Sequence, residues 1–147
     1  MKILFDTNVV LDVLQQRQPH FTFSAPLMNR VEQGTLTGLL CATTVTTIAY
    51  LTEQHLMKEK GRTRIAARAG TTALLDMLLK IFDIAPVTRA VIERAANSRF
   101  EDFEDSVLHE SAIAAGVDGI VTRNQRDYEK SVVAIYSPQE LEASLTR

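Results

Sequence analysis

The stretch Lys2–Leu14 reads KILFDTNVVLDVL and contains the pattern that decides the fold. It opens with a short apolar run, and Asp6-Thr7-Asn8 end that run with side chains that commonly cap helices. From Val9 to Leu14, apolar residues recur at helical spacing. The pattern predicts a short buried strand that is followed directly by a helix.

The same order of strand and helix repeats along the chain, with glycines and prolines between the elements. Helices are expected near 23–33, 43–60, 65–79, 88–97 and 102–116 and from Pro138, with strands at 36–42, 81–87, 119–122 and 132–136. Strands that alternate with helices predict an α/β fold. We expect a mostly parallel central sheet of four to five strands, with helices on both faces and right-handed crossovers.

The length and composition are those of one ordinary globular domain. We expect residues 1–147 to form a single domain, because a chain of 147 residues builds one core. Hydrophobic residues make up 46% and charged residues 23%, which excludes a disordered chain. No apolar run approaches the roughly twenty residues that cross a membrane, and the residues before Asp6 lack the apolar core of a secretory signal. The sequence therefore predicts a cytoplasmic protein without a membrane span.

The charges are nearly balanced, with a formal net charge of −2. This total does not indicate nucleic acid as a partner, so a polyanion would have to meet a local basic patch. Five cations fall within eleven positions, at Lys58, Lys60, Arg62, Arg64 and Arg68. A solvated helical surface explains this patch equally well.

One predicted helix has especially clear ends, with Asp102 at its N-cap and Gly116 as its C-terminal stop. Within it, Asp105 shares a face with Leu108 and Ala112, at spacings of three and seven, and this face must turn toward the core. Burial of an uncompensated carboxylate is costly. Asp105 therefore needs a bound cation, hydrogen-bond donors or a proton.

Polar side chains follow the predicted strands, whose carboxyl ends meet at one edge of a parallel sheet. Asp6 follows the first strand, Asn124 and Asp127 follow the strand at 119–122, and Asp105 joins them from its helix. Taken singly, each acid is explained by helix capping or by simple exposure. Together they favour a site that holds a hard divalent cation through oxygen ligands.

A cation held by carboxylates suits phosphodiester hydrolysis. It can generate hydroxide, polarise a phosphoryl oxygen and neutralise charge on the leaving oxygen. No protein nucleophile is then needed, and Ser106 and the three histidines form no recognisable triad. His109 lies one helical turn after Asp105, within reach of the site, although a packing role explains it better.

Three segments resemble PIN-domain proteins: Ile3–Asn8 (ILFDTN), Asp102–Leu108 (DFEDSVL) and Ile120–Tyr128 (IVTRNQRDY). The resemblance spans nearly the whole chain and is greatest to the toxin nucleases of bacterial toxin–antitoxin pairs. It implies a Rossmann-like sheet, Mg²⁺ or Mn²⁺ held by clustered acids, and endonucleolytic cleavage of RNA.

Matched motif by motif, the resemblance implies that Asp6 and Asp105 are the principal metal ligands. Asn124 and Asp127 match the supporting polar residues. Toxin nucleases of this kind are usually homodimers that a small antitoxin binds, so the resemblance also implies these protein partners. Apolar residues between Thr43 and Leu79 offer surface for either contact, or else face the sheet.

One position departs from the family. The family commonly has a glutamate at the start of the helix after the second strand, where residues 43–48 read TTVTTI. Glu53 lies six residues beyond Thr47 and off the equivalent helical position. Asp102 can compensate from the other side, which makes it a third expected metal ligand. Loss of one carboxylate lowers the expected cation affinity.

The main prediction is therefore a metal-dependent endoribonuclease, the toxin of a toxin–antitoxin pair. The missing glutamate favours an alternative, a PIN-like module with weak catalysis that binds RNA or a partner protein. A third interpretation makes Asp6 the nucleophile of a phosphatase that resembles the haloacid dehalogenase family. Asn8 disfavours it, because that family typically has a second aspartate there.

Overall fold

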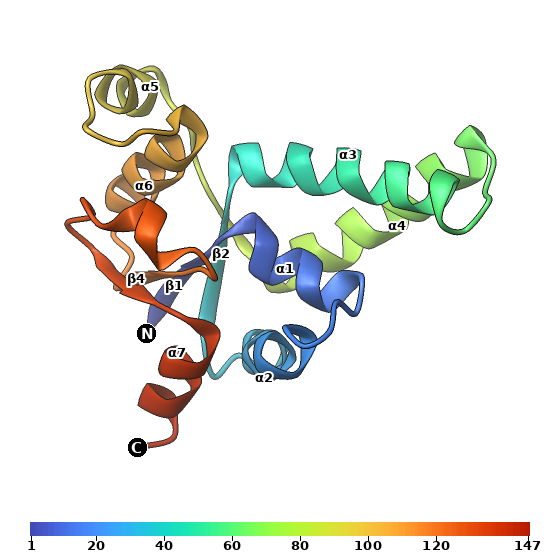
Figure 1. The fold of residues 1–147 in the computed structure, drawn as a ribbon, viewed down its shortest axis with the longest axis horizontal. Helices are drawn as coiled ribbons and strands as arrows, with labels where there is room; N and C mark the ends of the chain where they lie inside the picture. The colour runs from blue at the N-terminus through green and yellow to red at the C-terminus, as the bar shows by residue number, and fades with distance from the viewer.

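A five-stranded sheet forms the centre of the computed structural model, which describes residues 1–147 (Figure 1). All neighbouring strands are parallel, in the order β3-β2-β1-β4-β5. The strands are β1 (Lys2–Phe5), β2 (Thr37–Cys41), β3 (Asp83–Ala85), β4 (Gly119–Val121) and β5 (Ala134–Tyr136). The α/β prediction is confirmed, and the sheet is parallel throughout.

Seven α-helices and one short 3-10 helix, η1, connect and flank the strands. They are α1 (Thr7–Leu14), α2 (Phe21–Glu32), α3 (Ala42–Lys58), α4 (Arg64–Ile81), α5 (Arg89–Ala96), α6 (Phe103–Ala115), η1 (Gln125–Tyr128) and α7 (Pro138–Leu145). Gly116 ends α6 in the left-handed conformation (φ 63°), as its position in the sequence predicts. None of the helices is both long and apolar enough to cross a membrane.

β3 and β5 each begin two residues later than predicted, because the residues before them make other contacts. α4 continues to Ile81, since Leu78 and Ile81 pack against the core from the same side of the helix. Val132, the expected start of the last strand, is 79% exposed, and its N–H donates to His109 Nε2 (3.2 Å). Apolar runs therefore locate these strands without defining their limits.

Different helices cover the two faces of the sheet, because successive side chains of a strand point to opposite faces. Ile3 and Phe5 pack in a core with residues of α1, α2, α3, α4 and α7, whereas Leu4 packs with residues of α5 and α6. Figure 1 shows α5 and α6 on one side of the strands and α1 to α4 on the other. The predicted coverage of both faces is confirmed.

The strand order reverses beside β1. The chain adds β2 and β3 on one side of β1 and then crosses over to add β4 and β5 on the other. In open α/β sheets, ligands bind outside the carboxyl ends of the strands at such a switch point. Asp6 directly follows β1 and Thr122 directly follows β4, so these residues flank the position where a site is expected.

Candidate functional site

Asp6 is the N-cap of α1 and is only 7% exposed. Its Oδ1 accepts a hydrogen bond from the Thr7 N–H and its Oδ2 accepts one from the Thr122 hydroxyl, both at 2.7 Å. Burial raises the pKa of Asp6, the two hydrogen bonds oppose this increase, and the charges of Glu104 and Asp127 add to it. One carboxylate therefore caps a helix and also belongs to an acidic cluster.

The loop after β4 is attached to α1 at two points. Besides its bond to Asp6, the Thr122 hydroxyl accepts a hydrogen bond from the Asn124 N–H (3.0 Å). The next residue, Arg123, forms an ion pair with the fully buried Asp12 of α1 (Nε to Oδ2, 2.9 Å). These contacts hold the exposed Asn124 at the carboxyl edge of the sheet, where the sequence places it.

Asp105 lies in the first turn of α6 and is half-buried, as its place on the core stripe predicts. Burial, followed by the charges of Asp102, Asp6 and Asp127, raises its pKa to about 6. The hydroxyl of the buried Tyr128 donates to Asp105 Oδ1 (3.3 Å), which favours the charged carboxylate. Burial and the charges of Asp6, Asp105 and Asp127 raise the pKa of Tyr128, so its hydroxyl remains a neutral donor.

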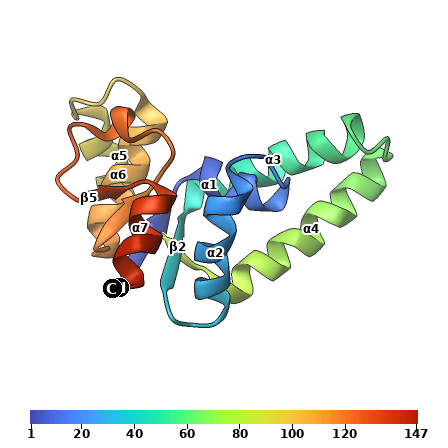
Figure 2. The ribbon, with the colours of Figure 1, turned by 60° about the horizontal axis from the view of Figure 1, so that its bottom comes forward.

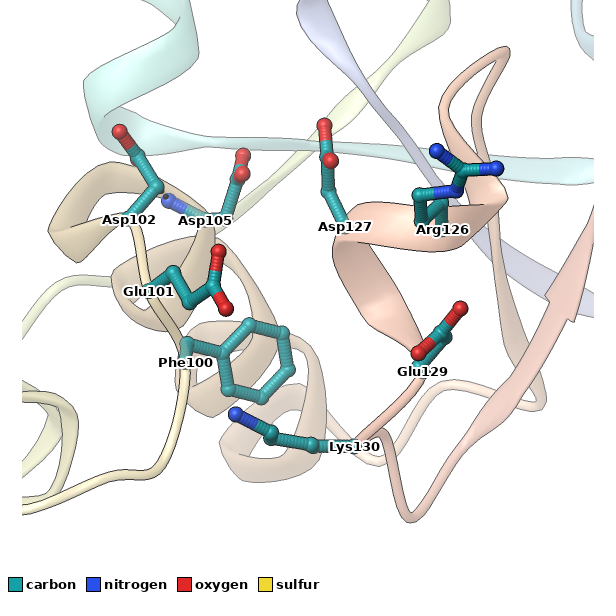
Figure 3. Close-up of a pocket in the computed structure, with 8 residues that line it drawn as sticks. All are labelled: Phe100, Glu101, Asp102, Asp105, Arg126, Asp127, Glu129 and Lys130. Carbon is teal, nitrogen blue, oxygen red and sulfur yellow. Dashed lines mark hydrogen bonds between the residues drawn. The ribbon is translucent and has the colours of Figure 1, made fainter.

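A hollow of about 480 Å³ opens beside Asp105 (Figure 3). Five acids, two cations and one aromatic ring line it: Glu101, Asp102, Asp105, Asp127, Glu129, Arg126, Lys130 and Phe100. The carboxylates of Asp102, Asp105 and Asp127 point to the same side of this hollow. Asp102 also caps α6, because its Oδ1 accepts the Asp105 N–H (3.0 Å). The excess of acids makes the hollow attractive to cations.

The structure brings the predicted acids into one electrostatic cluster, since the charges of Asp6, Asp102 and Asp127 all act on Asp105. Asn124 adjoins this cluster, because its carbonyl oxygen accepts the Asp127 N–H (3.0 Å). No three acids come close enough together in this conformation to hold a metal ion by themselves. The cluster thus offers oxygen ligands that are near one another without a closed cage.

Sequence reasoning assigned no role to Glu104 or Tyr128, and the structure gives both a place in the cluster. Glu104 Oε1 accepts a hydrogen bond from the Thr47 hydroxyl (3.4 Å), at the start of α3 where the family glutamate is missing. The only signal in the sequence was the presence of another acid beside Asp105. Whether such a side chain faces α3 or solvent depends on how two helices pack.

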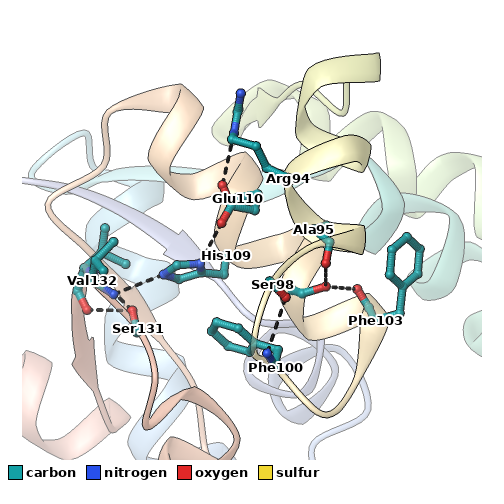
Figure 4. A network of polar contacts seen from close by, with 11 residues as sticks. Arg94, Ala95, Ser98, Phe100, Phe103, His109, Glu110, Ser131 and Val132 are labelled. Carbon is teal, nitrogen blue, oxygen red and sulfur yellow. Dashed lines mark hydrogen bonds and ion pairs between the residues drawn. The ribbon is translucent and has the colours of Figure 1, made fainter.

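His109 has a packing role rather than a place among the acids (Figure 4). It is buried, its Nε2 accepts the Val132 N–H, and its ring packs against Phe100 with 4.8 Å between ring centroids. Its Nδ1 lies 3.6 Å from Glu110 Oε1. Burial lowers the pKa of His109, which favours the neutral ring that the Val132 N–H requires. Its contacts join α6 to the segment before β5.

Solved structures of similar fold come from protein complexes. A chain of the VapBC2 complex of Rickettsia felis, bound to a DNA fragment from its promoter, is 14% identical with a TM-score of 0.63, and the match covers 93% of this chain and 98% of that one. A chain of the FitAB complex bound to a DNA fragment is 19% identical (TM-score 0.68; 93% and 95% covered). A chain of a toxin–antitoxin complex from Klebsiella pneumoniae is 18% identical (TM-score 0.67; 95% and 99% covered).

Comparison with curated protein sequences finds no match. The PIN domain family, in contrast, matches residues 2–126, which extend from β1 into η1. This range contains Asp6, Asp105 and Asn124 and ends one residue before Asp127. Because the match covers most of the chain and the sheet has the expected parallel order, the protein belongs to the PIN domain family.

Proposed function

We propose that this protein is a metal-dependent endoribonuclease that acts in the cytoplasm as the toxin of a toxin–antitoxin pair. The observation that carries the proposal is that Asp6, at the switch point between β1 and β4, lies close enough to Asp105 of α6 for its charge to act on Asp105. Each carboxylate has a raised pKa, and the charge of Asp6 contributes to that of Asp105. Carboxylates whose charge is destabilised by burial and by neighbouring acids are favourable ligands for a cation.

The donor set fits Mg²⁺ or Mn²⁺. Asp6, Asp105 and Asp127 offer carboxylate oxygens and Asn124 offers an amide oxygen, and hard divalent cations prefer oxygen ligands. The lack of a closed cage of three acids is compatible with Mg²⁺, because this ion keeps several waters and uses as few as one or two carboxylates. When bound there, the ion supplies Lewis-acid activation of water and of a phosphoryl oxygen.

The surrounding residues have supporting roles in this proposal. Asp6 and Asp105 hold the cation, and Thr122 and Tyr128 orient them through the hydrogen bonds to their carboxylate oxygens. Asn124 and Asp127, both exposed at the same edge, orient water or support the ligands. Arg126 and Lys130, which line the hollow beside Asp105, contact phosphate groups of the RNA backbone.

Metal affinity is expected to depend on pH through Asp105. Because its pKa is raised to about 6 in the metal-free protein, a proton competes with the cation below that pH. Each unit below pH 6 should weaken Mn²⁺ binding by up to about tenfold, whereas affinity should level off above pH 7. Mn²⁺ titrations monitored by electron paramagnetic resonance at pH 5 to 8 measure this profile. An equally steep profile in Asp105→Asn would assign the proton to another group.

The family glutamate is missing near Thr47, so another acid has to supply the third carboxylate of the site. Asp102 was the expected substitute for the missing glutamate, and it caps α6 through one oxygen. Glu104 instead contacts Thr47 itself, and its charge acts on Asp6. We therefore propose that Glu104 would supply much of the negative charge that the family glutamate contributes to the site.

Glu104→Gln is expected to weaken Mn²⁺ affinity by about tenfold at pH 7.5, since outer-shell partners typically contribute a factor of ten to a hundred. Asp102→Asn is the matched control, because asparagine caps a helix as well as aspartate does. It should change affinity less than Glu104→Gln, with the same melting temperature as wild type. The reverse order of the two affinities would return the role to Asp102.

The similar structures support a protein partner for this chain. One of them is a toxin–antitoxin complex, which supports an antitoxin partner for this chain. Exposed apolar residues on α4, including Ile65 (85%), Met77 (46%) and Leu79 (51%), supply surface for an antitoxin or for a second copy in a homodimer. Light scattering of the purified chain, alone and with a candidate antitoxin, tests both contacts.

Cleavage of a mixed RNA pool by highly purified protein with Mg²⁺, Mn²⁺ or EDTA tests the enzymatic proposal. Cutting that requires a divalent ion is the expected result. Metal-independent RNA or antitoxin binding without turnover would favour the weakly catalytic binding module, which the absence of an acid at 43–48 motivates. The phosphatase alternative has less support, because Asn8 stands where that family typically has a second aspartate.

A further inference from the structure

The hairpin formed by α3 and α4 projects from the rest of the molecule (Figures 1 and 2). The two helices lie side by side, and the turn between them, residues 59–63, is far from the sheet and from α6 in both views. This turn and the adjoining helix ends are therefore accessible to a large partner from several directions.

Five cations gather at this end of the hairpin, and we call them the basic tip: Lys58, Lys60, Arg62, Arg64 and Arg68. All five residues are exposed. The ion pairs between arginines and acids in the structure involve Arg30, Arg89, Arg94 and Arg123, so no residue of the basic tip forms an ion pair.

Positive charge is therefore concentrated in one segment of the chain, and the remainder is acidic. Residues 58–68 contain five cations and one acid, Glu59, which gives this segment a formal charge of +4. Because the whole chain carries −2, the remainder carries −6. A polyanion that approached the acidic cluster directly would be repelled, whereas the basic tip attracts it.

α3 connects the basic tip to the candidate site. Its first turns contact the site through the hydrogen bonds from Thr7 to Thr44 (3.3 Å) and from Thr47 to Glu104 (3.4 Å). Thr47 and Lys58 are eleven residues apart, so they share a face of the helix and are separated by roughly 16 Å. About five stacked nucleotides at roughly 3.4 Å each span this distance.

An aromatic side chain lies between these two points. Tyr50 is 64% exposed on α3, three residues after Thr47 and within about 60° of the same face. Exposed aromatic rings beside cations are the elements that bind single-stranded nucleic acid, because bases stack on the rings while cations contact phosphates. The arrangement favours RNA over an acidic protein segment, which has no bases to stack.

We propose that the basic tip binds the phosphate backbone of a single-stranded RNA several nucleotides from the bond to be cut. The strand then runs along α3, stacks a base on Tyr50 and enters the acidic cluster. This assignment rests on the proposed RNA substrate, and it adds a second contact that determines where along the strand the cut falls.

The test measures binding of a labelled fifteen-nucleotide RNA by the full chain in EDTA over a series of salt concentrations. The tip variant carries Lys58→Gln, Lys60→Gln and Arg62→Gln, and the control variant carries Lys80→Gln, Arg89→Gln and Arg147→Gln, which remove the same charge from exposed positions elsewhere. The tip variant should bind at least about tenfold more weakly at low salt, with a slope of log affinity against log salt reduced by about 2. The control variant should keep the wild-type slope.

Tyr50 gives a second measurement that does not change charge. Tyr50→Ser should weaken RNA binding by about fivefold or more, whereas Tyr50→Phe should bind like wild type. Equal affinities and slopes for the tip and control variants would overturn the proposal, and metal-dependent cutting by both would leave the nuclease function standing. Loss of polyglutamate binding by the tip variant, with RNA binding unchanged, would assign the tip to an acidic protein partner instead and also overturn it.

Discussion

Asp6→Asn is expected to lower metal-dependent RNA cleavage by at least about a thousandfold, which corresponds to roughly 4 kcal/mol of transition-state stabilisation. Asparagine removes the charge that is proposed to hold the cation while it keeps nearly the same shape. Its oxygen can still accept the Thr7 N–H. Its amide group can donate to the Thr122 hydroxyl oxygen, whose second lone pair accepts the Asn124 N–H.

Asp6→Asn should lose activity without a loss of stability. Burial raises the pKa of Asp6, which means that the folded protein disfavours this charge. Removal of the charge should therefore leave the melting temperature of the metal-free protein unchanged or higher. Cleavage assays and thermal melts in EDTA measure the two properties, and Asp76→Asn on the exposed side of α4 is the control. Cleavage at the wild-type rate by Asp6→Asn would refute the proposed mechanism.

Arg123→Met is expected to destabilise the protein at pH 7 by about 3 kcal/mol, the scale of breaking a buried ion pair. Asp12 is fully buried, and its paired oxygen lies 2.9 Å from Arg123 Nε, while neither of its oxygens accepts a hydrogen bond. Without Arg123 the Asp12 carboxylate loses its nearest compensating charge. Urea unfolding of the metal-free protein measures the change in the free energy of unfolding.

The same variant should be less impaired in acid. Burial raises the pKa of Asp12 above its ordinary value even in the wild type, and the Arg123 charge opposes this increase. An acid with a raised folded pKa favours the fold when it is protonated, so the deficit of Arg123→Met should shrink as the pH falls from 7 towards 4. The double variant Asp12→Leu/Arg123→Met should recover most of the stability, because it leaves no unpaired charge. A double variant as unstable as Arg123→Met would point to lost packing.

Arg123 is also expected to affect the geometry of the site. Arg123 stands between Thr122, which contacts Asp6, and Asn124, which is proposed to support the metal. Two attachments of one loop to α1, at Asp6 and at Asp12, explain how a short exposed loop holds Asn124 and Asp127 at the edge of the sheet. The stability and the geometry of the site therefore share the same contacts.

Local patterns determined most of the fold. The apolar run before Asp6, the helical spacing after it and the cap and stop residues at Asp102 and Gly116 are all properties of neighbouring residues, and the structure confirms each element they predict. The positions of Asp6 and Asp105 in the fold were also predictable, because an acid after a strand and an acid at the head of a core stripe are visible in the sequence. Chain connectivity then places them at one edge of a parallel sheet.

Only the tertiary structure decided which side chains meet. Glu104 contacts Thr47 across 57 positions of the sequence, and Asp12 pairs with Arg123 across more than a hundred, so no local spacing reveals either contact. The raised pKa of Asp105 likewise arises from burial and from charges on other elements. Sequence periodicity specifies which face of a helix is buried, but the direction of a polar side chain depends on the elements that pack beside it.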